Sequence, residues 1–243
     1  MRLTRIHIDE PLGQSSRVTL RGAAANHVRQ VLRLGPADEI VVFDGRGGEY
    51  AARIDELRKD TLLIAVGEHR LIERESPLAV TLAQGVSRGE RMDLVVQKAT
   101  ELGVRRIAPL LTERTVVRLD AKQADAKRRH WRGIAIAACE QCGRNIVPQI
   151  ALPVTLTAFL SSLEPDAVRV LLSPAGGSKV SDLEPTDAPL TLLIGPEGGL
   201  CESEQRVAIE AGFRVVNLGP RVLRTETAAI AALAAIQQHL GDI

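Results

Sequence analysis

The chain has 243 residues, of which 45% are hydrophobic and 25% are charged, a balance typical of a folded globular protein. Its apolar runs are much shorter than the ~20 residues that a membrane-spanning helix requires, and its first residues lack the apolar core of a secretory signal. The three cysteines, an odd number in a long chain, argue against a secreted disulfide framework. We therefore expect a cytoplasmic protein that does not bind membranes.

Charge is distributed unevenly along the chain. The net charge is 0 over residues 1–75, +6 over 76–150 and −5 over 151–243, although the whole chain carries only +1. A basic middle segment is compatible with a polyanionic partner such as RNA, and equally with arginines that only solvate helix faces. Aromatic residues make up just 2% of the chain, too few for a protein that binds single strands by base stacking.

Residues 1–75 have the pattern of a small β-rich domain. Short stretches of alternating apolar and polar residues, separated by turn-forming Gly and Asp, predict strands at 2–9, 39–45, 49–57 and 61–70. One helix is predicted over 24–34, where Val28 and Val31 recur at helical spacing. A charged linker at 71–77 closes this domain, which we expect to be a barrel or a sandwich.

Beyond the linker, apolar strands alternate with helices. The predicted strands lie at 78–86, 107–113, 168–174, 190–196 and 214–219. Helices are predicted over 92–102, with Gly103 as the C-cap, over 124–143, and after each of the last two strands. Strands that alternate with helices indicate a parallel sheet. The fold class that we expect for residues 76–243 is therefore α/β.

The strongest local motif is the loop at 195–199, with the sequence GPEGG. It follows an apolar strand and precedes a helix, and ligands of open α/β sheets bind at the carboxyl ends of strands. Glycines at this position let backbone amides and carbonyls approach a ligand without a Cβ in between. The spacing matches neither a dinucleotide-binding loop nor a Walker loop, so a phosphate cradle is not indicated.

A second motif runs over residues 214–240. The strand ends near Gly219, and a loop leads into a helix for which Thr225 or Thr227 is predicted as the N-cap, with Glu226 near the positive helix end. The helix is apolar on nearly all sides and rich in Ala. Such a helix is expected to be buried, either within the domain or against a second copy of the chain.

Together these two loops resemble the cofactor-binding region of the SPOUT methyltransferases. The whole chain resembles, within that class, the family that methylates N3 of a uridine in 16S ribosomal RNA. The matching motifs, in chain order, are HxxxVLR at 27–33, QKATELGV at 97–104, TERTVV at 112–117, the run 129–144, GPEGG at 195–199 and LGxxxLRTETA at 218–228. The resemblance covers nearly the full length of the chain.

The resemblance implies a fold, a cofactor and partners. It implies a PUA-like β-barrel over 1–75 that binds RNA, and a SPOUT methyltransferase domain over 76–243 with a C-terminal trefoil knot, which ordinary topology rules do not anticipate. It implies S-adenosylmethionine as the cofactor and 16S rRNA of the 30S subunit as the substrate. It also implies a homodimer in which each site borrows residues from its neighbour.

The motif positions assign the expected cofactor-binding residues. On one wall of the pocket these are Leu193, Ile194, Gly195, Pro196, Glu197, Gly198 and Gly199. On the other wall they are Leu218, Gly219, Val222, Leu223, Arg224, Thr225, Glu226, Thr227 and Ala228. Most contacts to the cofactor are expected to come from the backbone of these tight loops.

The resemblance also indicates which residues meet the substrate. Arg114 and Arg132 are the catalytic candidates, because a guanidinium group beside the uracil favours the anion that forms when N3 loses its proton. The residues expected to bind RNA are Arg2, Arg5, His27, Arg29, Arg33, Arg88, Lys98, Gln141 and Arg144. For any single arginine, a solvated helix face is the alternative interpretation.

Two positions depart from the family pattern, and one motif has a structural explanation. Cys201 stands where similar sequences have Ser or Thr, which weakens a capping box with Glu204. Asn26 stands where the pattern has a first His. Cys139 and Cys142 form a C-x-x-C within a predicted helix, but no second ligand pair follows, so we expect packing thiols and no metal.

Other functions stay open on the sequence alone. The chain could be a non-catalytic module that binds rRNA during ribosome assembly and retains the cofactor pocket, or a SPOUT methyltransferase that acts on another RNA. A nucleotide hydrolase is disfavoured, because no phosphate-binding lysine lies in a glycine loop. Retention of S-adenosylmethionine, but not of ATP, by the purified protein would separate a methyltransferase from a hydrolase.

Overall fold

The computed structural model describes residues 3–13, 16–163 and 165–243. The chain forms two compact units, which we describe separately. Unit 1 comprises Met1–Glu75 together with Cys139–Val147, and unit 2 comprises Ser76–Ala138 and Pro148–Ile243. The sequence had placed residues 139–147 with the second domain, whereas the structure places them in unit 1. Arg2, one of the residues expected to bind RNA, lies outside the described residues.

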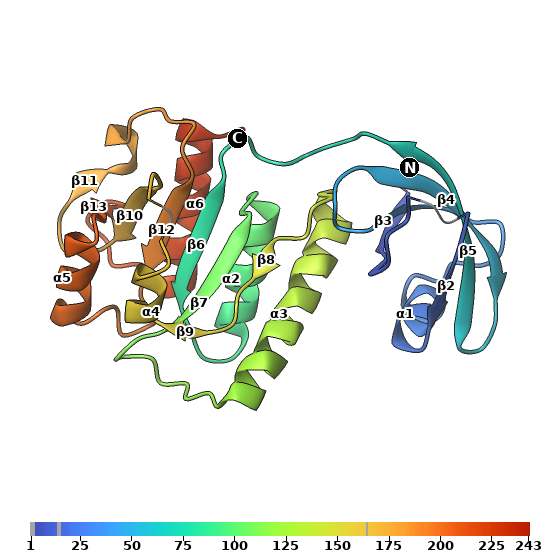
Figure 1. The fold of residues 1–243 in the computed structure, drawn as a ribbon, viewed down its shortest axis with the longest axis horizontal. Coiled ribbons are helices and arrows are strands. Elements are labelled where there is room, and N and C mark those ends of the chain that lie inside the picture. Colours follow the sequence, from blue (N-terminus) through green and yellow to red (C-terminus); the bar gives the residue numbers. More distant parts are fainter. Residues whose placement is uncertain (1–2, 14–15, 164) are drawn as a thin grey trace. The chain divides into compact units, whose positions relative to one another are not determined.

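Unit 1 is built on a five-stranded sheet with the order β1-β3-β4-β5-β2 (Figure 1). The strands are β1 (Thr4–His7), β2 (Arg17–Arg21), β3 (Glu39–Phe43), β4 (Glu49–Leu57) and β5 (Thr61–Arg70). β1 pairs with β3 in parallel and the other pairs are antiparallel. The apolar side chains enclosed by the sheet are aliphatic, among them Ile6, Val42 and Ile64. The β-rich prediction is confirmed, although β2 was not anticipated.

The predicted helix of unit 1 is present in two short pieces. α1 (Ala23–Asn26) is followed directly by a π-helical turn, η1 (His27–Val31). Val28 is buried in the core, but Val31 is 65% exposed. The helical spacing therefore predicted the segment correctly and the buried face only in part, because a π-turn rotates the later side chains away from the core.

A buried ionic network holds residues 139–147 to the sheet of unit 1. Arg5 forms an ion pair with Glu49 and lies 4.8 Å from the centroid of the Phe43 ring. Arg5 also donates to the carbonyl of Arg144 at 3.1 Å, and Arg144 itself pairs with Glu75, 3.1 Å from Nε to each carboxylate oxygen. Arg5 is 8% exposed and Arg144 2%. Since both guanidinium groups neutralise buried carboxylates, we correct our expectation and leave them out of the RNA-binding surface.

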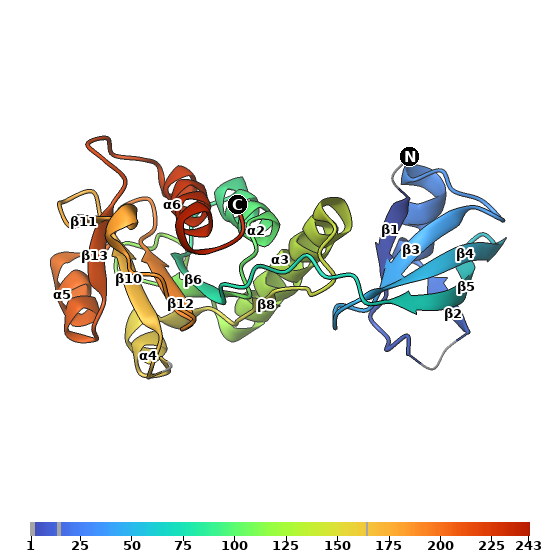
Figure 2. The same ribbon diagram turned by 90° about the horizontal axis from the view of Figure 1, so that it is seen from above.

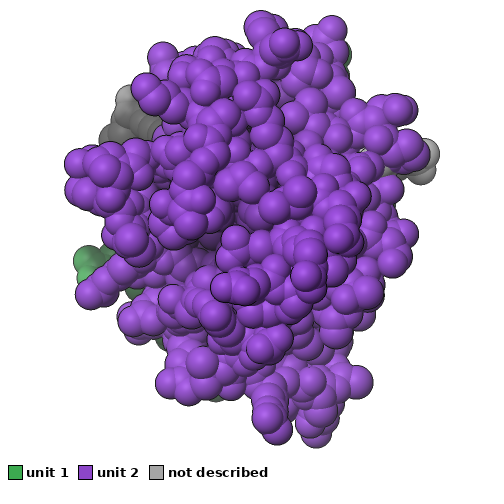
Figure 3. Space-filling model, turned by 90° about the vertical axis from the view of Figure 1, so that its left-hand side faces the viewer, with its two compact units in different colours: residues 1–75, 139–147 green, residues 76–138, 148–243 purple. Residues whose placement is uncertain are grey.

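Unit 2 contains an eight-stranded sheet in which every described strand pair is parallel, as predicted. Its order is β11-β13-β10-β12-β6-β7-β8, and β9 pairs with β7. The strands are β6 (Val80–Gly85), β7 (Arg106–Leu111), β8 (Gln149–Ile150), β9 (Val154–Thr155), β10 (Val168–Leu172), β11 (Ser178–Lys179), β12 (Leu190–Ile194) and β13 (Arg214–Asn217). Figure 3 views the surface of this unit from the side on which α5 lies in Figure 1.

Helices cover both faces of this sheet (Figure 2). They are α2 (Glu90–Glu101), α3 (Ala121–Cys142), α4 (Leu156–Leu160), α5 (Glu202–Glu210) and α6 (Thr225–Leu240), with a short 3-10 turn, η2 (Val180–Asp182). α2 and α6 pack together on one face, and α4 and α5 lie on the other. α2 ends where predicted, because Gly103 adopts a φ of +83° that favours glycine. The sequence thus predicted α2, α3, α5 and α6, but not α4 or η2.

Unit 2 is thus the α/β domain with a parallel sheet that the sequence predicts, and the trefoil knot stays a prediction. None of the helices in the described ranges combines the length and the apolarity needed to cross a bilayer.

The ionic network of unit 1 gives a first prediction. Arg5→Ala is expected to destabilise unit 1 by roughly 3–5 kcal/mol, because it leaves the Glu49 carboxylate buried without its closest partner. Urea unfolding followed by circular dichroism measures this loss. Arg58→Ala is the matched control, since Arg58 pairs with Glu56 at 2.8 Å on the exposed surface, and it should leave the unfolding midpoint unchanged. Equal midpoints for the two variants would contradict a structural role for Arg5.

Candidate active site

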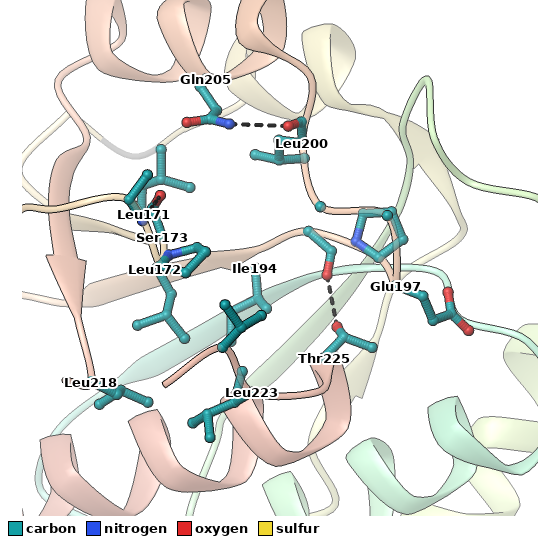
Figure 4. Close-up of a pocket in the computed structure, with 18 of the residues that line it drawn as sticks. Leu171, Leu172, Ser173, Ile194, Glu197, Leu200, Gln205, Leu218, Leu223 and Thr225 are labelled. Carbon is teal, nitrogen blue, oxygen red and sulfur yellow. Dashed lines mark hydrogen bonds between the residues drawn. The ribbon is translucent and has the colours of Figure 1, made fainter. Parts of the chain in front are cut away.

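A cavity of about 320 Å³ opens at the carboxyl ends of three neighbouring strands, β10, β12 and β13. This is the end of an open parallel sheet where ligands bind, and the volume suits a small molecule. The loops after the three strands and the first turn of α6 form its walls (Figure 4). The residues that line it are Arg114, Leu171, Leu172, Ser173, Pro174, Ala175, Ile194, Gly195, Pro196, Glu197, Gly198, Gly199, Leu200, Gln205, Leu218, Gly219, Arg221, Val222, Leu223, Thr225 and Ala228.

The GPEGG loop forms a tight turn directly after a fully buried strand. All five residues of β12 are buried, and the N–H of Gly199 donates to the carbonyl of Pro196 at 2.8 Å. A Cβ on Gly195 would lie 2.8 Å from the backbone nitrogen of Leu200. The loop can close this tightly only with glycine at position 195, and its backbone therefore lines the cavity.

A second close approach, at Gly85, was missed in the sequence. β6 lies beside β12 with Gln84 opposite Ile194, so Gly85 ends next to the GPEGG loop. A Cβ at Gly85 would lie 2.4 Å from the backbone nitrogen of Pro196. The GPEGG loop thus packs directly against the backbone at Gly85, and a side chain at position 85 would not fit between them.

The loop that precedes α6 differs from the prediction at its helix start. The N-cap is Arg224, whose backbone is extended and whose side chain makes no capping bond. Thr225 is the first residue of the helix, and Thr227 is exposed in the same turn. The predicted cap at Thr225 or Thr227 was therefore wrong. The hydroxyl of Thr225 is directed elsewhere, because it bonds to the other cavity loop.

Thr225 joins the two predicted loops through a buried hydrogen-bond network. Its hydroxyl donates to the carbonyl of Gly195 at 2.7 Å, as drawn in Figure 4, and accepts from the side-chain amide of Gln84 at 2.9 Å. The same amide lies 3.1 Å from the carbonyl of Gly85. Thr225 is 7% exposed and Gln84 is fully buried. Both loops are thus held in one arrangement by a single threonine hydroxyl.

The rest of the cavity is largely apolar. Leu171 and Leu172 from the end of β10 face leucines from the other loops across the cavity (Figure 4). Gln205 from α5 fixes the far side, because its amide donates to the carbonyl of Leu200 at 3.0 Å. The sequence predicts a strand over 168–174 but assigns no ligand contact to the loop that follows it. The apolar run that ends in Ser173-Pro174 at the end of a strand could have indicated that this loop contacts a ligand.

The structure brings most of the expected cofactor-binding residues to this cavity. Those that border it are Ile194, Gly195, Pro196, Glu197, Gly198, Gly199, Leu218, Gly219, Val222, Leu223, Thr225 and Ala228. Those that do not border it are Leu193, Arg224, Glu226 and Thr227. Leu193 is buried inside β12, whereas Arg224 and Thr227 are exposed. The structure adds residues that the sequence analysis missed, namely Leu171, Leu172, Ser173, Pro174, Ala175, Leu200, Gln205 and Arg221.

Glu197 carries the negative charge at the rim. Its side chain points away from the cavity in Figure 4. Its carboxylate accepts the backbone N–H of Arg88 and the guanidinium of Arg91, each at 2.9 Å. Burial acts to raise the pKa of Glu197, but these hydrogen bonds outweigh it and hold the pKa below its ordinary value. Glu197 therefore stays ionised and fastens the loop to the start of α2.

The two catalytic candidates are placed differently. Arg114 lines the cavity, and its guanidinium donates to the carbonyl of Gly198 at 2.9 Å. Arg132 lies on the exposed surface of α3 and does not border the cavity. Of the two candidates, Arg114 alone borders the cavity. Arg221 also borders the cavity and is exposed.

The other residues expected to bind RNA lie on both units. In unit 1, His27 and Arg33 are exposed, and Arg29 bonds to the side chain of Asn26 at 2.9 Å. Gln141, in the last turn of α3, is also exposed. In unit 2, Arg88 is exposed, and Lys98 is half-buried and pairs with Glu101 at 2.8 Å. These positions are compatible with an RNA surface on each unit and do not define one.

The cysteines are free thiols. Burial raises the pKa of Cys139 to about 12, so this thiol stays protonated. Within the described ranges no cluster of His, Cys, Asp and Glu could hold a metal ion.

At Cys201, the Glu204 carboxylate still accepts the N–H of residue 201 at 3.1 Å. The helix start of α5 thus keeps the capping-box arrangement with Glu204.

The fold and the cavity define a class of protein, an RNA methyltransferase with a PUA domain. Residues 74–237 match the family model described as an RNA methyltransferase domain, and residues 20–66 match the one described as an RNA methyltransferase PUA domain. The chain belongs to the family of ribosomal RNA small subunit methyltransferase E. It is 33% identical to the member from Buchnera aphidicola subsp. Schizaphis graminum over 242 residues, covering 100% of this chain and 98% of that one.

Another member of the family and two solved structures are also similar to this chain over nearly its whole length. The Bacillus subtilis member is 32% identical over 243 residues, covering 96% of this chain and 93% of that one. A Legionella pneumophila protein in complex with bound SAM superposes with a TM-score of 0.95 at 39% identity over 100% of both chains. The Neisseria gonorrhoeae member bound to S-adenosyl methionine gives a TM-score of 0.92 at 36% identity, again over 100% of both chains.

The close approach at Gly85 gives a second prediction. Gly85→Ala is expected to displace the GPEGG loop and to weaken S-adenosylmethionine binding by about tenfold or more, ~1.4 kcal/mol, because the new Cβ overlaps the backbone of Pro196. Isothermal titration calorimetry measures the affinity. Gly133→Ala is the control, since a Cβ there meets nothing within 4 Å on α3. If Gly85→Ala binds the cofactor as tightly as the control, the packing argument is wrong.

Proposed function

We propose that this protein is an S-adenosylmethionine-dependent methyltransferase that acts in the cytoplasm on N3 of a uridine in the 16S rRNA of the small ribosomal subunit. The observation that carries the proposal is the cavity in which Thr225 joins the two loops at the ends of β12 and β13. The relatives with bound S-adenosylmethionine support it, because they share the fold over their whole length.

The residues around the cavity fit this cofactor. Leucines from β10 and from the loops after β12 and β13 offer apolar faces for a flat base. Gly198 and Gly199 border the cavity, and because they carry no Cβ a ligand can approach the backbone of the glycine-rich turn closely. A cavity of about 320 Å³ is large enough for a nucleoside with a short side chain.

Two features support RNA as the methyl acceptor: the PUA domain in unit 1 and the positive charge of the middle segment. The matched PUA domain lies entirely within unit 1, and the middle segment of the chain carries a net charge of +6. The small-subunit rRNA as the particular acceptor rests on the printed names of the relatives. Uracil N3 as the acceptor atom rests on the resemblance of the motifs.

For methyl transfer, the protein has two tasks: to orient the cofactor and to stabilise the anion that forms on the uracil. When bound, S-adenosylmethionine supplies an electrophilic methyl group on its sulfonium sulfur. Thr225 and Gly195 hold the two loops that orient the cofactor. Arg114, fixed on the carbonyl of Gly198, places a positive charge at the cavity wall. That charge favours the anion left when the uracil imide loses its N3 proton, which is the form able to attack the methyl group.

We also propose the homodimer and the knot that the resemblance implies. The outer face of α6 supports pairing, because Ala231, Ala234 and Ala235 are small, apolar and only half-buried in the single chain. Two copies packed through this face would bury it. Sedimentation equilibrium tests the dimer, and a monomeric mass at micromolar concentration would contradict it.

The function is tested by methyl transfer. Labelled S-adenosylmethionine is incubated with the protein and with 30S subunits that lack their normal modifications, and the labelled nucleoside is identified. N3-methyluridine in 16S rRNA is the expected product. Cofactor binding without transfer to 30S subunits or to free 16S rRNA would contradict the proposed substrate, and failure to bind the cofactor would contradict the proposed activity.

The role of Arg114 gives a third prediction. Arg114→Ala is expected to lower the turnover number by roughly 10²–10³ with little change in cofactor affinity, because it removes charge that acts on the reacting base. Arg114→Lys should recover part of the rate. Arg206→Ala, on the exposed surface of α5, serves as the control. Unchanged turnover in Arg114→Ala would remove this residue from the chemical step.

A further inference from the structure

Basic side chains are concentrated on the first half of α3, away from the residues that line the cavity. Residues 121–132 of this helix hold five basic side chains and one acidic one, a net charge of +4, while the whole chain carries only +1. The remainder of the protein is therefore net negative. None of Lys122, Lys127, Arg128 and Arg129 borders the cavity. We call these four side chains the basic half of α3.

This half of the helix is not held by a buried face. Residues 121–130 are exposed or half-buried without exception. The first fully buried side chain is Trp131, which is 1% exposed and donates to Asp93 of α2 at 3.2 Å. His130 contacts the same carboxylate at 2.9 Å. The helix is thus anchored at its middle, and the turns before Trp131 project from that anchor.

The start of the projecting helix is nevertheless fixed. The side chain of Asp120 accepts the N–H of Gln123 at 2.8 Å, and the side chain of Gln123 accepts the N–H of Asp120 at 3.0 Å. This reciprocal capping stabilises the first turn without any packing. A helix that is polar on all sides gains little from burial. Packing therefore does not account for these exposed side chains, which are free to bind a partner.

The charge of the basic half is only partly neutralised within the chain. Asp125 is shared by Arg128, at 2.9 Å, and by Arg129. Lys122 and Lys127 have no ion-pair partner in the part of the chain that the structure describes. Residues 122–129 hold four cations and one carboxylate, so the excess positive charge is self-repelling in the free protein. A polyanion that enters between them removes this repulsion.

We propose that the basic half of α3 binds phosphates of the RNA backbone when the substrate is bound, an inference that rests on the proposed function. Ten residues of helix span about 15 Å, so side chains over this length can reach several successive phosphates. Because Trp131 is buried, the exposed surface from Lys122 to Arg129 offers no aromatic ring on which a base could stack. The contact therefore positions the RNA and does not read its sequence.

The test compares two variants with the same loss of charge. One replaces the basic half of α3 in Lys122→Gln, Lys127→Gln and Arg129→Gln. The matched control replaces three exposed basic residues elsewhere in unit 2, Arg105→Gln, Lys179→Gln and Arg206→Gln. Both variants must retain the circular dichroism spectrum and the cofactor affinity of the unaltered protein. Binding to protein-free 16S rRNA is then measured over a range of salt concentrations.

The α3 variant is expected to bind this RNA about tenfold or more weakly at low salt, with the slope of log affinity against log salt reduced by about two. The control should keep both values close to those of the unaltered protein. Equal slopes and affinities for the two variants would overturn the inference. A loss seen with intact 30S subunits but not with protein-free RNA would also overturn it, since the partner would then be a ribosomal protein.

This test separates the inference from the proposed function. If the unaltered protein methylates 30S subunits and the α3 variant behaves as the control does, only the inference fails. If no methyl transfer occurs but the α3 variant alone loses its salt-dependent RNA binding, the proposed function fails and the assignment of the surface is supported.

Discussion

The hydrogen bond from the Thr225 hydroxyl to the carbonyl of Gly195 is the contact on which the cavity depends. The two residues are 30 positions apart in the chain and belong to different loops. Gln84 adds a third element, β6, by donating to the same hydroxyl. All three groups are buried, so none can exchange its partner for water without a cost. The loops therefore keep one arrangement, and a cofactor meets a pocket that is already formed.

Charge is arranged around this pocket in a way that leaves its interior apolar. Glu197 belongs to the glycine-rich loop, yet its carboxylate is directed outward to Arg88 and Arg91. Arg114 and Arg221 both border the cavity, and the guanidinium of Arg114 donates to a backbone carbonyl. The pocket thus combines a largely apolar interior with two guanidinium groups at its wall.

The GPEGG loop could be predicted from the sequence because a glycine cluster after an apolar strand marks a ligand loop of a parallel sheet. The loop before α6 contains a single glycine, Gly219, and was assigned to the cofactor from the family resemblance. The parallel sheet itself followed from the alternation of strands and helices. Gly85 and Gln84 could not be predicted, since their importance depends on β6 lying beside β12, a neighbour more than a hundred residues away. Arg5 was misjudged for a similar reason. The sequence around Arg5 does not indicate that this arginine will be buried in an ion pair with Glu49, which lies 44 residues further along the chain.

The account is tested most directly by the affinity of Thr225 variants for S-adenosylmethionine, measured by calorimetry. Thr225→Val keeps the shape of the side chain but removes both bonds of the hydroxyl, and it leaves only the longer bonds from the Gln84 amide to the carbonyls of Gly85 and Gly195, at a cost of ~1–3 kcal/mol. Thr225→Ser keeps the hydroxyl. The account predicts that the serine variant binds the cofactor nearly as the unaltered protein does and that the valine variant binds it roughly ten- to a hundredfold more weakly. Equal affinities for the two variants would show that the pocket does not depend on this bond.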